Sequence, residues 1–170
     1  MVNNDIEKKA TAILEETDLG SILPVNILAL AQFYGFSVYA SVLDDSMSGL
    51  IMVDEKPLDG YASNKVIVVN AHHSPRRKRF TIAHELGHYF LNNRPKQCYA
   101  HRDIAGSYNS EERDANQFAS ALLMPKDQVL ECIQNHSFVG FDELVEFVSN
   151  LFNVSEDAAR VRLSKLGLLS

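Results

Sequence analysis

Apolar residues recur every three or four positions through the first 35 residues, and this spacing predicts two helices. The first is expected over residues 4–17, and its apolar face comprises Ile6, Ala10, Ile13 and Leu14. The second is expected from Pro24 to about Tyr34, because proline is favoured at a first helical position. Gly35 then provides a residue that can end the helix.

Three short segments rich in β-branched and apolar residues follow, and they predict strands. They are residues 37–43, 49–53 and 66–70. A polar turn at residues 44–46 separates the first two segments. We therefore expect a small twisted, mixed β-sheet that contains at least one hairpin.

The pattern changes to helical spacing in the second half of the chain. Ser74 and Pro75 form a cap and first turn for a helix that ends near Asn92. Residues 93–109 are predicted to be a polar loop, and further helices are expected at residues 111–123, from about 125, at 141–151 and at 155–166. This order of elements indicates an α+β fold.

The helix that ends near Asn92 carries a narrow polar stripe on an otherwise apolar surface. From Phe80 to Leu91 most side chains are apolar, which is typical of a buried helix. The polar exceptions share one face, at positions i, i+3, i+4 and i+7, and are Thr81, His84, Glu85 and His88. Because a buried polar group without a partner costs roughly 1–3 kcal/mol, this stripe requires a ligand or a partner.

The spacing of the stripe predicts a metal site. His84 and His88 lie four residues apart, so both rings can bind one ion. Glu85 lies beside them and can accept a proton from a water activated by the metal. Two core histidines bonded to backbone would be the ordinary alternative, but this alternative leaves the rest of the stripe unexplained. Gly87 is expected to allow close packing behind the ligands.

A catalytic zinc site of this kind needs a third protein ligand. Leu91 and Arg94 occupy the positions at which one zincin subclass has glycine and histidine, so that subclass is excluded. The other common solution is a glutamate on a later helix, and residues 111–123 supply Glu112.

Glu112 is singled out because it continues the inward-facing stripe of its helix, which comprises Ala115, Phe118, Ala119 and Leu122. Asn116 lies one turn later on the same stripe and can orient a metal ligand from behind. His101 and Glu111 remain alternatives for the third ligand. Zinc is the default metal for this set, although manganese or iron would also accept two histidines and a carboxylate.

These residues resemble the ImmA/IrrE family of metallopeptidases. The resemblance rests on residues 79–88, 112–119 and 122–125, and it is specific across about residues 66–126. It implies a gluzincin-like, zincin-like fold with zinc on His84, His88 and Glu112 and with Glu85 as general base. Residues 1–126 would form the zinc peptidase core, and residues 127–170 a helical, helix-turn-helix-like subdomain packed on it.

The resemblance also implies a partner. Family members cleave or otherwise inactivate a helix-turn-helix repressor of the Xre type, so an endopeptidase acting on such a repressor is expected. A non-proteolytic regulator that binds the repressor and holds a structural metal is the alternative. Because the sequence ends at Ser170, we expect no additional C-terminal sensor domain of the kind that larger members carry.

Composition narrows these functions further. The chain has 170 residues, is 46% hydrophobic and has a net charge of −6, which disfavours a general binder of nucleic acid or anionic membrane. No N-terminal signal segment and no membrane span are expected. Cys98 and Cys132 lack a paired spacing, which favours free thiols in a cytoplasmic protein.

Three further features of the sequence are weaker signals. The basic run Arg76–Arg79 predicts either a solvated face or contact with an acidic partner. Residues 141–170 include a helix-turn-helix-like pattern, but five acids against three bases favour packing or partner docking over DNA binding. The candidates for stabilising an oxyanion or lining the site are Tyr61, His72, His73, His101 and Tyr108, and Cys98 has no spacing that supports metal binding.

Overall fold

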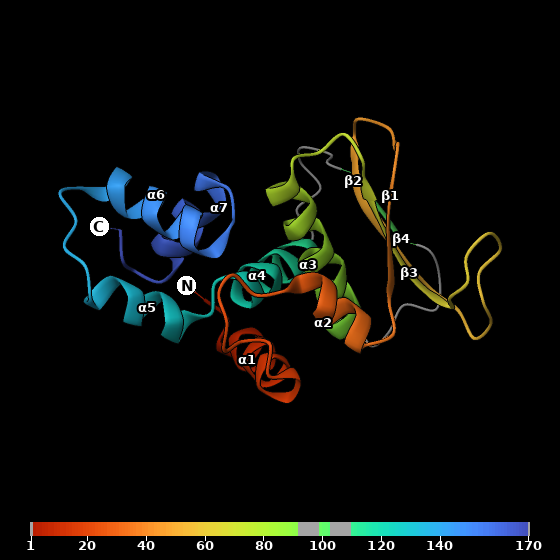
Figure 1. Ribbon diagram of the computed structural model, residues 1–170, viewed down its shortest axis with the longest axis horizontal. Helices are drawn as coiled ribbons and strands as arrows, with labels where there is room; N and C mark the ends of the chain where they lie inside the picture. The colour runs from red at the N-terminus through yellow and green to blue at the C-terminus, as the bar shows by residue number, and fades with distance from the viewer. Residues whose placement is uncertain (1, 92–98, 103–109, 170) are drawn as a thin grey trace.

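The computed structural model describes residues 2–91, 99–102 and 110–169 of the chain. Figure 1 shows a β-sheet at one end of the molecule, helices α1–α4 in the middle and helices α5–α7 at the other end. The predicted α+β class is therefore confirmed. In the described part of the chain, no helix is both long and apolar enough to cross a membrane.

The two N-terminal helices cover the middle of the molecule. Helix α1 (Asn4–Thr17) buries the predicted apolar face and packs on α4. Helix α2 (Ile27–Phe33) begins later than predicted, because the Asn26 side chain accepts a hydrogen bond from the backbone N–H of Ala29 and caps the helix there. Pro24 follows a cis peptide bond and precedes the helix, so its predicted place in the first turn is wrong.

The sheet has four strands among the described residues. They are β1 (Ser37–Ser41), β2 (Met47–Val53), β3 (Lys65–Asn70) and β4 (Tyr99–Arg102), in the spatial order β1-β3-β2-β4. Strand β1 runs parallel to β3, whereas β2 runs antiparallel to both β3 and β4. The mixed sheet is as predicted, and its hairpin joins β2 to β3.

Two details of the predicted sheet need correction. A turn at residues 44–46 does separate β1 from β2, but these strands do not pair, because β3 lies between them. The segment predicted as a polar loop, residues 93–109, contains β4. This short strand is ordered by pairing with β2, about 50 residues earlier in the chain, and no local pattern reports such a contact.

The middle of the molecule is built on helix α3 (Pro75–Leu91), which lies between the sheet and helix α4 (Ser110–Leu123). Gly87 sets the spacing of the two helices. A Cβ atom at this position would lie 3.0 Å from both the Cα and the carbonyl oxygen of Ala115. The absence of a side chain therefore allows α3 and α4 to approach closely, as predicted for Gly87.

The C-terminal part consists of helices α5 (Lys126–Gln134), α6 (Phe141–Phe152) and α7 (Glu156–Lys165). The Ser155 hydroxyl caps α7, as predicted, by accepting from the N–H of Ala158. Arg162 of α7 is fully buried and donates to both carboxylate oxygens of Glu7 on α1, at 2.7 and 2.8 Å. These helices therefore pack on the core, while the division at residue 126 into two folding units stays a prediction.

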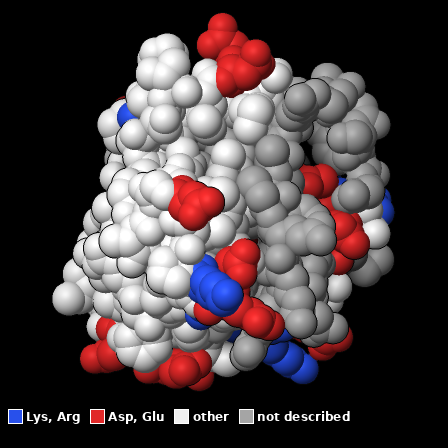
Figure 2. Space-filling view, turned by 90° about the vertical axis from the view of Figure 1, so that its right-hand side faces the viewer, with Lys and Arg blue, Asp and Glu red and all other residues white. Residues whose placement is uncertain are grey.

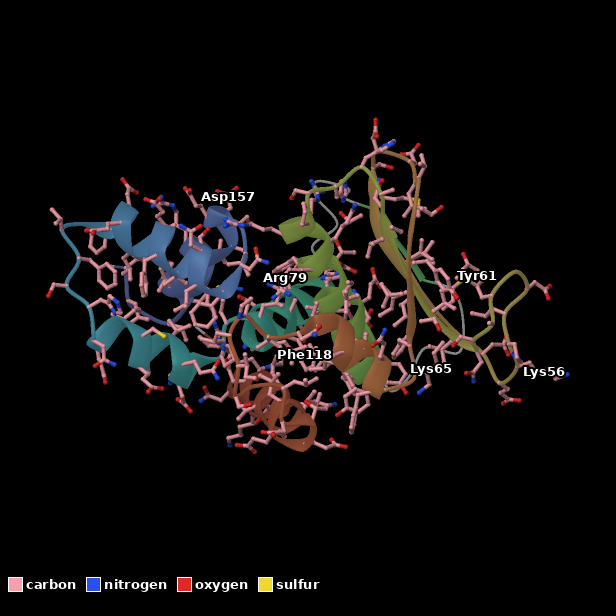
Figure 3. All side chains as sticks on the ribbon, in the orientation of Figure 1. Lys56, Tyr61, Lys65, Arg79, Phe118 and Asp157 are labelled. Atoms are coloured by element: carbon pink, nitrogen blue, oxygen red, sulfur yellow. The ribbon has the colours of Figure 1, made fainter. Side chains whose placement is uncertain are left out.

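Two residues of the basic run at the start of α3 have a role that was not predicted, whereas Arg77 is exposed. Arg76 donates to the side chains of Ser149 and Asn150 on α6, both at 2.8 Å. Arg79 donates to the carbonyl oxygens of Val25 and Asn153, and burial lowers the pKa of its guanidinium. Two of these bases are therefore internal links between α3 and the C-terminal helices, where Figure 3 shows Arg79.

Charge is unevenly distributed over the described surface. Seen from the sheet end, most described side chains are neither acidic nor basic, and the acidic and basic groups form small patches both at the rim and near the middle of that view (Figure 2). This end offers no continuous basic surface for nucleic acid among the described residues, in keeping with the net charge of −6.

Candidate metal centre

Three side chains from two helices converge between α3 and α4. His84 and His88 project from successive turns of α3, and their Nε2 atoms lie 3.0 Å apart. Glu112, in the first turn of α4, places Oε2 3.3 Å from His84 Nε2 and Oε1 3.2 Å from His88 Nε2. The side chains of His84, His88 and Glu112 are 11%, 6% and 28% exposed, so the group is shielded but reachable from solvent.

The geometry and chemistry of this group fit a zinc ion. One ligand atom from each of the three residues lies within 4.8 Å of the others. A tetrahedral zinc with bonds of about 2.0–2.1 Å holds neighbouring donor atoms about 3.3 Å apart, close to the spacing found here. Two imidazoles and one carboxylate also leave a fourth coordination position open, which is typical of catalytic rather than structural zinc.

Asn116 orients one of the two histidines. Its side-chain oxygen lies 3.0 Å from Nδ1 of His84, one helical turn beyond Glu112. Because an amide oxygen only accepts hydrogen bonds, this contact places the proton on Nδ1 and leaves a lone pair on Nε2. Nε2 is the atom that faces His88 and Glu112, so the contact selects the tautomer that a metal requires.

Glu85 is fully buried beside the group, where strand β2 crosses α3. A Cβ atom at Gly49 of β2 would lie 3.6 Å from Oε1 of Glu85 and only 2.5 Å from Cγ2 of Thr81. Glycine is therefore needed for β2 to pass this close to the helix. This role of Gly49 was not predicted from the sequence, although a glycine inside a strand is a known sign of close backbone approach.

Among the described side chains, none of the remaining candidates belongs to this group. Glu111 is exposed on α4, and Tyr61 packs against Tyr39 of β1, at the edge of the sheet away from β2, with ring centroids 5.1 Å apart. His72 is exposed, before the first turn of α3. Cys132 is a free, partly buried thiol on α5, and burial raises its pKa. Cys98, Tyr108 and the side chain of His101 lie outside the described residues.

Comparison with known proteins gives matches over most of the chain. The family model for the IrrE N-terminal-like domain, a peptidase family, matches residues 45–164. The "Uncharacterized immunity region protein 2" of Bacillus phage phi105 is 29% identical over 113 residues, which are 66% of each of the two chains. This chain therefore spans just under two thirds of that relative's length.

A solved structure of a Mycobacterium tuberculosis transcriptional regulator has the same fold. It superposes with a TM-score of 0.63 at 19% sequence identity, over 96% of this chain and 47% of the regulator. This chain thus spans about half of the regulator's length. At this identity the similarity shows a common fold, and nothing about shared activity.

Proposed function

The chain belongs to the family of IrrE N-terminal-like peptidase domains, and on this premise we propose that it is a zinc-dependent endopeptidase. The convergence of His84, His88 and Glu112 on one point, with Glu85 buried beside them, carries the proposal. Asn116 supports it by holding His84 in the tautomer that binds a metal.

The proposed reaction is hydrolysis of a peptide bond. A zinc ion on His84, His88 and Glu112 would supply a Lewis acid and an activated water at neutral pH. Glu85 is proposed to accept the proton of the attacking water and to pass it to the amine that leaves. The substrate would lie extended beside a sheet edge, and β4 is the edge strand next to β2, whose Gly49 contacts the region of Glu85.

The proposed substrate is a cytoplasmic helix-turn-helix repressor of the Xre type. Two observations support this choice: the resemblance to the ImmA/IrrE metallopeptidases, and the name of the phage relative as an immunity region protein. Cleavage of the repressor would then relieve repression. Direct binding of nucleic acid is not part of the proposal, because the chain is acidic overall.

The first test is metal content by elemental analysis of the wild type and Glu112→Ala, purified in the same way. About one zinc per chain is expected in the wild type, and most of it should be lost from the variant, because two histidines alone bind zinc weakly. Glu111→Ala is the matched control, since this exposed neighbour lies outside the group, and it should retain zinc. A wild type that holds no metal even after reconstitution contradicts the proposal, while manganese or iron in place of zinc corrects the choice of ion.

The second test separates an enzyme from a binding protein. Glu85→Gln keeps the shape of the side chain but removes the proposed base, so repressor cleavage should fall by at least about 100-fold. Zinc content and repressor binding should both persist. Gel electrophoresis of the repressor measures cleavage, and a pull-down measures binding. Full regulation by Glu85→Gln without cleavage would support the alternative, a non-proteolytic regulator with a structural metal.

A further inference from the structure

A second site of a different kind lies on the opposite side of α1 from the sheet. A cleft of about 820 Å³ separates α1 and the loop after it from helices α5 and α7. Neither the metal-centre residues nor Glu85 line it. Its volume falls in the range of sites for small molecules, and such sites occur preferentially where two parts of a fold meet.

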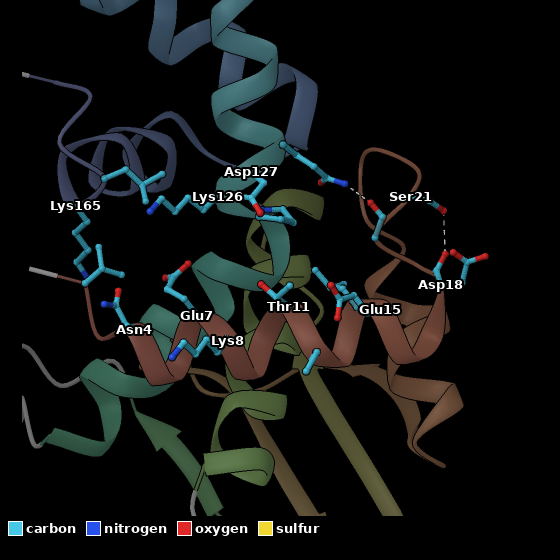
Figure 4. A pocket seen from close by; sticks show the side chains of 17 residues that line it. Asn4, Glu7, Lys8, Thr11, Glu15, Asp18, Ser21, Lys126, Asp127 and Lys165 are labelled. Carbon is cyan, nitrogen blue, oxygen red and sulfur yellow. Dashed lines mark hydrogen bonds between the residues drawn. The ribbon is translucent and has the colours of Figure 1, made fainter.

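Most of the charges that line the cleft lie toward one of two ends, while Asp127 of α5 lies near Lys126, as Figure 4 shows. Lys8 of α1, Lys126 of α5 and Lys165 of α7 gather at one end, although they come from three different helices. Glu15 and Asp18 lie toward the other end, at the last turn and the C-cap of α1. A ligand that complements this cleft must be anionic at one end and cationic at the other.

The floor of the cleft carries an acid that is already paired. The Glu7 carboxylate accepts two hydrogen bonds from the buried guanidinium of Arg162. This pairing occupies both carboxylate oxygens of Glu7, so it is a weak counter-ion for the lysine end. The three lysines outnumber the one further acid near them, Asp127, and therefore favour a carboxylate brought by a ligand.

Uncharged polar groups line the cleft between its charged ends. Asn4 and Thr11 of α1 and Ser21 of the following loop offer donors and acceptors. Gln128 of α5 donates to the carbonyl oxygen of Gly20, and its own side-chain oxygen is buried with no hydrogen-bond partner within the described part of the chain. These groups suit the amide N–H and C=O groups of a peptide.

The length of the cleft can be estimated along α1. Glu15 follows Lys8 by seven residues and Asp18 follows it by ten, which at a rise of 1.5 Å per residue are about 10 and 15 Å. An extended peptide covers about 3.3–3.6 Å per residue, so about three or four residues span this distance. We propose that the cleft binds a short peptide of this length, with its free carboxylate at the lysines and its free ammonium at Glu15 and Asp18.

The direct test is calorimetric titration with tetra-alanine at low ionic strength. The peptide with free termini should bind at least about tenfold more tightly than the same peptide acetylated and amidated, because both charged contacts are lost in the blocked form. Added salt should weaken the free peptide selectively, since the contacts lie near the surface. Equal affinity for the free and the blocked peptide overturns the proposal.

A pair of lysine variants locates the bound peptide. Lys126→Glu combined with Lys165→Glu should weaken binding about tenfold, through the loss of attraction at the carboxylate end. Lys56→Glu is the matched control, because this exposed lysine lies at the far end of the molecule, in the loop between β2 and β3 (Figure 3), and affinity should not change. If Lys56→Glu weakens binding as much as the double variant does, the attraction depends on the overall charge and the cleft is not the binding site.

The same titration on Glu112→Ala separates this inference from the proposed peptidase. Binding should be unaffected, because the cleft contains none of the metal-centre residues. A loss of binding in this variant means that the peptide occupies the metal centre. This outcome contradicts the proposed peptide site in the cleft and leaves the proposed peptidase function unaffected. Binding at the cleft by a chain that holds no metal would support the proposed peptide site and contradict the proposed peptidase.

Discussion

At the residue scale, the candidate site depends on contacts that orient its proposed ligands. Asn116 decides which nitrogen of His84 carries the proton, through a contact of 3.0 Å. The positions of the two histidines follow from helix geometry, because His84 and His88 lie on one face of α3. The contact from Asn116 can thus be removed without deleting a proposed ligand.

Asn116→Ala is expected to weaken zinc affinity by about 10–100-fold, because His84 loses the acceptor that holds its ring and tautomer. Competition with a chromogenic chelator measures the change. Asn135→Ala provides the control, since the side chain of this exposed C-cap residue of α5 donates to the carbonyl oxygen of Glu131, on its own helix. Wild-type affinity in Asn116→Ala would contradict the orienting role.

At the element scale, the site depends on how closely two helices approach. His84 and His88 belong to α3, whereas Glu112 and Asn116 belong to α4, so the separation of the helices determines whether the four side chains meet. Gly87 and Ala115 are the residues that allow the short separation. Close packing at these small residues therefore brings together the candidate metal ligands as well as the core.

Gly87→Ala tests this spacing. Alanine favours a helix by about 1 kcal/mol over glycine, but its Cβ would lie 3.0 Å from the Ala115 backbone, and overpacking of this kind costs about 1–3 kcal/mol. We expect a net loss of roughly 1 kcal/mol in the free energy of unfolding and weaker zinc binding, measured by urea denaturation and chelator competition.

The control for this change is Gly140→Ala. A Cβ at Gly140 meets nothing within 4 Å, and the backbone there is extended, so stability and zinc binding should both stay near the wild type. A Gly87→Ala variant that is more stable than the wild type and binds zinc normally would show that the spacing of α3 and α4 is not limiting.

At the scale of the whole molecule, side-chain contacts join the N-terminal and C-terminal helices. Arg162 near the C-terminus pairs with Glu7 near the N-terminus and donates to the carbonyl oxygen of Met124 at the end of α4. Arg76 and Arg79 link the start of α3 to the same C-terminal helices. The C-terminal helices therefore belong to the framework around the candidate site.

Glu7→Gln is expected to lower the free energy of unfolding by about 3 kcal/mol, because it leaves the fully buried Arg162 guanidinium without its carboxylate. Thermal and urea denaturation measure this loss. The control is Asp142→Asn, which removes the exposed ion pair between Arg160 and Asp142 and should change stability very little. Similar losses in both variants would show that the buried ion pair contributes no more to the free energy of unfolding than the exposed pair.

The sequence by itself determined the local part of this protein. The turn-by-turn spacing of His84, Glu85 and His88 needs only the geometry of one helix, and the inward stripe of α4 pointed to Glu112 and Asn116 in the same way. Most helix boundaries followed from the same periodicity and from capping residues such as Ser155. These features were predictable because they depend on residues within one or two turns of each other.

Only the tertiary structure decided the features that join distant segments. Strand β4, the place of β3 between β1 and β2, and the contact of Gly49 with α3 all depend on pairing across the chain. The basic run at the start of α3 has the composition of a solvated surface, but the partners of Arg76 and Arg79 lie more than 50 residues away. The physical reason is that strand order, helix spacing and buried ion pairs are set by which surfaces meet, and no local pattern of residues records that choice.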